Sequence, residues 1–149
     1  MIKVLFVCHG NICRSPMAEF MLKDKVKKAG RAGEFLIESA ATSTEEIGND
    51  MHYGTKSVLR QNSIPFSPRA ARQVVKADYE KYDYIIAMDS ANIRNLQRML
   101  GEDKDKKIYK LLDFTSASRD VADPWYTGNF EKTFEDISEG LESFLNKIS

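Results

Sequence analysis

Short hydrophobic runs alternate along the chain with longer segments of helical periodicity. The runs are rich in β-branched and aromatic residues and predict four buried strands, at residues 2–7, 35–39, 84–88 and 108–112. The longer segments predict helices, at residues 15–29, 53–61, 90–100 and 130–148. Residues 114–127 are polar and predict an irregular loop. Alternating strands and helices indicate a parallel sheet covered on both faces, so we expect one α/β domain of three layers over residues 1–149.

The loop after the first predicted strand is the first candidate site, because ligands of open parallel sheets bind beyond the carboxyl ends of the strands. This loop reads Cys8-His9-Gly10-Asn11-Ile12-Cys13-Arg14-Ser15-Pro16. A loop of this length can curl so that the backbone N–H groups of residues 9–14 point to one centre, beside the positive end of the next helix. Gly10 and Asn11 suit the curl because both tolerate left-handed backbone angles. The loop therefore predicts a site for a dianion such as phosphate.

Cys8 and Arg14 supply reactive groups at the two ends of this loop. The planar guanidinium of Arg14 matches two phosphate oxygens. The same positive surroundings favour the thiolate form of Cys8, which can attack phosphorus. Ser15 either donates a hydrogen bond to that sulfur or caps the helix, and one hydroxyl can do both. The alternative is a structural turn with a buried cysteine, but the place directly after the first strand favours the chemical interpretation.

Composition narrows the possible partners and location. Twenty-two basic residues balance twenty-two acidic ones, which argues against nucleic-acid binding. The apolar run at 2–7 is too short for a signal peptide or a membrane span. The chain has only two cysteines, too few for the disulfide framework typical of secreted proteins. We therefore expect a cytoplasmic protein. His9 and His52 have no companions at metal-ligand spacing, so we expect no metal site.

Several motifs resemble those of the low-molecular-weight protein tyrosine phosphatases. VCHGNICRSP resembles the family signature, and SAATS, YIIAMD and DPWY follow in the family's order along essentially the whole chain. The resemblance implies a flavodoxin-like fold with four parallel strands and no cofactor. It also implies hydrolysis of phosphotyrosine in proteins and of small aryl phosphates, with inorganic phosphate as product. We expect the protein to act as a monomer.

The resemblance also implies a mechanism. Cys8 takes the phosphoryl group, Arg14 and the loop amides stabilise its charge, and Asp123 of DPWY protonates the leaving phenol and later activates water. Partial burial beside Trp125 and the charge of the phosphate would favour the protonated form of Asp123. The residues alone would not select this acid, and Asp120 is its nearest competitor.

Further residues are predicted to support the loop. By resemblance, Asn11 and Ser43 form a pair that holds the loop in shape, and Asp89 is a structural partner of the active-site loops. Cys13, a small buried side chain in the alternative interpretation, is expected to form a reversible disulfide with Cys8. Relatives often have a histidine where this chain has Pro68 and Arg69, a departure that makes part of the supporting network uncertain.

Specificity depends on residues around the expected phosphate site. Trp125 and Tyr126 either form one wall of a slot for a phenol ring or pack against the last helix. Glu45 stands where many relatives have an aromatic residue, and there it would weaken stacking and repel acidic peptides. Ile12 resembles the tyrosine-specific members, whereas a phosphoarginine-specific bacterial subclass tends to have threonine.

Two other functions remain as alternatives. An arsenate reductase of the same fold would need further cysteines downstream, and none follows Cys13. A non-catalytic phosphate-binding module would tolerate the loss of the nucleophile or the acid, but both Cys8 and Asp123 are present. Hydrolysis of p-nitrophenyl phosphate would separate this second alternative from the enzyme.

Overall fold

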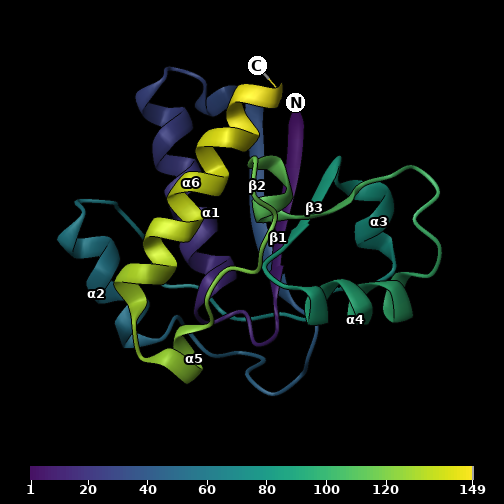
Figure 1. Cartoon of the computed structure of the whole chain (residues 1–149), viewed down its shortest axis with the longest axis horizontal. Coiled ribbons are helices and arrows are strands. Elements are labelled where there is room, and N and C mark those ends of the chain that lie inside the picture. Colours follow the sequence, from purple (N-terminus) through teal and green to yellow (C-terminus); the bar gives the residue numbers. More distant parts are fainter. Residues whose placement is uncertain (149) are drawn as a thin grey trace.

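The N-terminal strand lies inside a four-stranded parallel sheet in the computed structural model, which describes residues 1–148 (Figure 1). The strands are in the order β2-β1-β3-β4. Their bounds are β1 Ile2–Cys8, β2 Phe35–Ala41, β3 Tyr84–Ala87 and β4 Ile108–Lys110. β1 pairs with β2 over its whole length and with β3 over residues 4–7. This confirms the expected α/β class and the four parallel strands, in the order of a flavodoxin-like sheet.

Helices cover both faces of the sheet and make it the middle of three layers (Figure 1). One outer layer holds α1 Arg14–Lys28, α2 Tyr53–Gln61 and α6 Phe130–Ile148, where α1 contacts β1, β2 and α6. The other holds α3 Ala77–Lys81 and α4 Ser90–Leu100, where α4 contacts β3 and β4. Within residues 1–148, no helix has the length and apolar character needed to cross a bilayer.

The side chains of β1 alternate between two hydrophobic clusters. Val4, Phe6 and Cys8 join the cluster that packs against α1 and α6, whereas Leu5 and Val7 join the cluster beneath α4. Residues 4–7 are completely buried, as expected for an inner strand of a covered parallel sheet. The period of two therefore turns the side chain of Cys8 toward the layer of α1, whose N-terminus follows the loop.

The structure contains short helices that the hydrophobic pattern did not predict. The helix α3 is five residues long and has only one buried aromatic residue, Tyr79. It is therefore too short to show a helical period of hydrophobic positions. The helix α5, Pro124–Thr127, lies inside the segment predicted to be irregular. Short 3-10 helices occupy residues 32–34 and 111–114, and the second one ends β4 at Lys110, two residues before the predicted end.

Candidate active site

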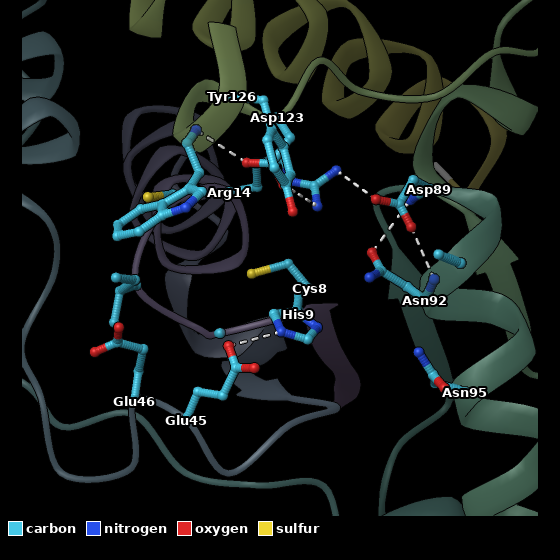
Figure 2. A pocket seen from close by; sticks show the side chains of 15 residues that line it. Cys8, His9, Arg14, Glu45, Glu46, Asp89, Asn92, Asn95, Asp123 and Tyr126 are labelled. Atoms are coloured by element: carbon cyan, nitrogen blue, oxygen red, sulfur yellow. Dashed lines mark hydrogen bonds and ion pairs between the residues drawn. The ribbon is translucent and has the colours of Figure 1, made fainter. Parts of the chain in front are cut away.

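A pocket of about 320 Å³ lies at the carboxyl ends of the strands, where the loops after β1, β2 and β3 meet residues 121–126 (Figure 2). Its lining includes Cys8, Arg14, Glu45, Asp123, Trp125 and Tyr126. Residues far apart in the sequence thus meet at the edge that the parallel topology predicted.

The loop between β1 and α1 turns its carbonyl groups away from this pocket. The carbonyl oxygens of Cys8 and His9 accept hydrogen bonds from the backbone N–H groups of Thr42 and Ser43, at 3.0 Å each. Further along, the Ile12 carbonyl accepts from the His52 amide at 2.9 Å. In a trans peptide the N–H points opposite to the C=O. The amides that follow these carbonyls therefore point toward the inside of the loop, where an anion would bind.

The curl of the loop depends on Asn11, whose φ of 59° lies in the left-handed region. Asparagine is one of the few residues that adopt this region at low cost. Gly10 was expected to share this role, but its φ is not positive, and the side chain of Glu46 lies beside it. A Cβ at Gly10 would lie 3.4 Å from Cγ of Glu46.

The side chain of Asn11 is buried and ties the loop to three other segments. Its Nδ2 donates to Oγ of Ser15 at 2.7 Å and to Oγ of Ser39 at 2.9 Å. Its Oδ1 accepts from Nη2 of Arg69 at 2.5 Å and from the backbone N–H of Arg72 at 3.3 Å. All polar atoms of the amide are therefore used, which fixes the strained residue in place.

Ser43 supports the loop separately from Asn11. Its hydroxyl donates to the carbonyl of His9 at 2.9 Å, and the serine that Asn11 contacts is Ser39. Asn11 and Ser43 thus each bond the loop, as expected of a supporting pair, and they do so through separate contacts.

Cys8 lies at the end of β1 with its sulfur beside the first turn of α1. Oγ of Ser15 is 3.0 Å from this sulfur, and the backbone N–H of Ser15 donates to it at 3.4 Å. The structure gives Ser15 no capping bond, since the cap residue is Cys13 and has no side-chain cap. Of the two roles considered for Ser15, the geometry places the hydroxyl at the sulfur. Such donors and the helix dipole stabilise a thiolate.

Arg14 is buried between two carboxylates at the back of the pocket (Figure 2). Its Nη1 lies 2.9 Å from Oδ2 of Asp89, and its Nη2 lies 3.3 Å from Oδ2 of Asp123. Nη1 also donates to the carbonyl of Val121 at 3.1 Å. Burial opposes the charge of the guanidinium, but Cys8 and the two carboxylates outweigh it and raise the pKa of Arg14. Arg14 therefore stays a cation.

Asp123 is the N-terminal cap of α5 and faces the pocket. Its Oδ1 accepts a hydrogen bond from the Trp125 amide at 3.0 Å, and Oδ2 meets Arg14. The competing Asp120 is absent from the pocket lining; it accepts from the Ser90 amide and pairs with Lys110, both at 3.1 Å. Despite some burial, these bonds lower the pKa of Asp120. Asp123 therefore reaches the site as the cap of α5, whereas Ser90 and Lys110 hold Asp120 outside it.

Cys13 also lines the pocket, but its sulfur is a poor nucleophile. Burial, together with the negative charges at Cys8 and Asp123, raises the pKa of Cys13 to about 12. Both cysteines are free thiols in this structure. Of the two sulfurs in the loop, Cys8 is therefore the one suited to attack.

The pocket mouth is polar on one side and aromatic on the other. Nε2 of His9 lies 2.9 Å from Oε2 of Glu45, and both side chains are exposed (Figure 2). Trp125 and Tyr126 also line the pocket, with 62% and 85% of their surfaces exposed. These two rings therefore face the pocket mouth and are not packed against the last helix, which was the alternative.

Two supporting residues escaped the sequence analysis. Ser39 is a polar residue on a buried strand, a signal that could have marked it. Arg69 was noted only as a departure from relatives, although it bonds Asn11. In residues 1–148, no group of three or more histidine, cysteine or acidic side chains is arranged to hold a metal ion.

Comparisons with known proteins agree with this geometry. The family model of low molecular weight phosphotyrosine protein phosphatases matches residues 3–149. The low molecular weight protein-tyrosine-phosphatase YfkJ of Bacillus subtilis is 47% identical over 150 residues, covering 99% of this chain and 96% of that protein. Its crystal structure has a TM-score of 0.95, with 99% and 94% of the two chains covered. The phosphatase SP-PTP of Streptococcus pyogenes is 41% identical, with a TM-score of 0.90 and coverage of 100% and 94%.

Proposed function

Since the chain belongs to the low molecular weight phosphotyrosine protein phosphatase family and so hydrolyses phosphotyrosine, we propose that Cys8, Arg14 and Asp123 carry out the reaction. The observation that carries the assignment is the position of the Cys8 sulfur. It lies under the first turn of α1, with the Ser15 hydroxyl at 3.0 Å, in the pocket that Arg14 and Asp123 also line.

The phosphate dianion binds in the loop above the sulfur of Cys8. The inward amides of residues 9–14 and the Arg14 guanidinium donate to its three peripheral oxygens. Arg14 then exchanges part of its contact with Asp123 for the phosphate. The carboxyl group released in this way lies close to a dianion, which favours its protonated form.

In the first step, the Cys8 thiolate attacks phosphorus in line with the tyrosine oxygen. An S–P bond forms while the P–O bond to tyrosine breaks, and the proton of Asp123 passes to the departing phenol oxygen. The product of this step is a cysteinyl-phosphate and free tyrosine in the substrate protein.

In the second step, water replaces the phenol and Asp123 accepts one of its protons. The water oxygen attacks phosphorus, the S–P bond breaks, and the sulfur leaves as a thiolate stabilised by Ser15. Inorganic phosphate is released, and Asp123 is protonated for the next cycle. The reaction balances with residues of this chain, water and the substrate.

The same proposal includes the setting of the enzyme. Residues 1–149 act as one phosphatase domain, as a monomer in the cytoplasm, on phosphotyrosine proteins. The absence of a membrane-spanning helix in residues 1–148 and a net charge of zero are consistent with this setting.

Steady-state hydrolysis of p-nitrophenyl phosphate and of a phosphotyrosine peptide tests these assignments. Cys8→Ser should abolish turnover while inorganic phosphate still binds. Asp120→Asn, the matched control for Asp123→Asn, should keep kcat/KM within about twofold, since Asp120 lies outside the pocket. Wild-type turnover by Cys8→Ser would refute the proposal.

A further inference from the structure

Four carboxylate residues line the pocket, against two basic ones. The carboxylates are those of Glu45, Glu46, Asp89 and Asp123, and the basic residues are Arg14 and His9. Asp89 and Asp123 both pair with Arg14 at the back of the pocket. The charges left at the mouth are therefore those of the two glutamates and His9.

The charges of the two glutamates are only weakly compensated. Glu46 accepts its hydrogen bond from the neutral amide of Asn49, at 2.6 Å. Glu45 meets His9 at 2.9 Å, and this histidine carries a charge only when protonated. Glu45 keeps 68% of its side chain exposed, so it can meet a substrate without losing its hydration.

The chain holds both glutamates at the mouth. The Ser43 hydroxyl bonds the His9 carbonyl at 2.9 Å and accepts from the Glu45 amide at 3.4 Å, which fastens this segment to the phosphate loop. The side chain of Glu46 lies beside Gly10 of the phosphate loop. Figure 2 shows Glu45 and Glu46 next to each other on one side of the pocket, where they can meet a residue adjacent to a phosphotyrosine bound in the loop.

We propose that Glu45 and Glu46 determine substrate choice, selecting phosphotyrosines flanked by lysine or arginine over those flanked by aspartate or glutamate. This inference rests on the proposed function of the pocket and specifies its substrates. Opposite charges attract a basic flank, whereas a carboxylate flank would be repelled at the same place. The exposed Trp125 ring in the same pocket offers a further surface for a cationic side chain.

Matched phosphotyrosine peptides that carry lysine, alanine or glutamate on both sides of the phosphotyrosine test the inference. The wild-type ratio of kcat/KM for the lysine and glutamate peptides should be about fivefold or more at low salt, from two exposed charge pairs. The ratio should fall in 0.5 M NaCl, because salt screens exposed charges over roughly a few ångströms at this strength. The Glu45→Gln/Glu46→Gln variant should bring the ratio close to one.

Glu142→Gln, which changes an exposed glutamate on α6 outside the pocket, is the matched control and should keep the wild-type ratio. If the wild-type protein hydrolyses p-nitrophenyl phosphate but cleaves all three peptides at equal rates, this inference alone is overturned. A preference that survives in the double variant would also overturn it. If the protein cleaved neither p-nitrophenyl phosphate nor any peptide, the proposed function would fail first.

Discussion

Nη2 of Arg69 donates a 2.5 Å hydrogen bond to Oδ1 of Asn11, across 58 positions of the sequence. Arg69 is itself held by the segment after β2, since its Nη1 donates to the carbonyl of Asn49 at 3.3 Å and its backbone N–H to Asp50. Asn11 is the one left-handed residue of the phosphate loop. The guanidinium of Arg69 therefore positions the loop through Asn11.

Loss of this guanidinium should weaken phosphate binding and turnover together. Arg69→Met keeps the apolar part of the side chain but leaves Oδ1 of Asn11 with one fewer donor. The cost is about 1–3 kcal/mol, which corresponds to a loss of roughly 5- to 150-fold in kcat/KM. Arg69→Lys should recover part of the loss, and Arg98→Met on the exposed face of α4 should have no effect. Inhibition constants for inorganic phosphate, measured beside kcat/KM, check this. An unchanged inhibition constant would contradict the positioning role.

Replacement of Asp123 should affect substrates according to their leaving groups. Asp123→Asn removes the proton donor, so hydrolysis of phosphotyrosine should fall by about 10²–10⁴-fold. p-Nitrophenol leaves more easily than the phenol of tyrosine, so its phosphate should lose much less activity. The measurement is kcat for a series of aryl phosphates, and equal losses across the series would exclude Asp123 as the acid.

The two cysteines should differ in alkylation. The pKa of Cys13 is raised to about 12, so its thiol stays protonated at pH 7 and at pH 9. Iodoacetate should therefore leave Cys13 unmodified at both values in the folded protein and should react at Cys8, the proposed nucleophile. Peptide mapping by mass spectrometry gives the result, and bound phosphate should protect Cys8. Preferential labelling of Cys13 would show that the nucleophile has been assigned to the wrong sulfur.

Mild oxidation should link the same two sulfurs. Peroxide converts the Cys8 thiolate to a sulfenic acid, which carries no charge and so removes one of the causes that keep the pKa of Cys13 high. The Cys13 thiol can then attack the sulfur of Cys8. The S–S bond forms, the S–O bond breaks, and the hydroxyl group leaves as water with the thiol proton. Dithiothreitol reverses this disulfide. Rapid appearance of sulfinic acid at Cys8, with no disulfide, would count against this protection.

The sequence was most informative where one strand leads directly into the site. The run at 2–7 predicts an inner strand, and its period of two turns Cys8 toward the helix whose N-terminus stabilises a thiolate. The Cys8-to-Arg14 spacing then predicts an anion site from local chemistry alone. Only the family resemblance could select Asp123, because Asp120 has the same chemistry and is set apart only by its tertiary contacts with Ser90 and Lys110.

Other features depend on contacts that no local pattern encodes. Ser39 and Arg69 reach Asn11 only after β2 and the 64–72 segment have packed beside the loop. The short helices α3 and α5 have too few residues to repeat a hydrophobic period, so their conformation follows from caps and neighbours. The resemblance suggested Asn11 and Ser43 as supports of the loop, and only the geometry of β2 added Ser39 as a partner of Asn11.

Trapping of the covalent intermediate tests the central claim most directly. The Asp123→Asn variant slows hydrolysis of the intermediate, so rapid denaturation after mixing with radiolabelled aryl phosphate should leave label on the protein. Peptide mapping should place the phosphate on Cys8, with no label in the Cys8→Ser/Asp123→Asn double variant. Two results would contradict a nucleophile at Cys8. One is label on Cys13 or on another side chain, and the other is turnover without any phosphorylated protein in a pre-steady-state burst.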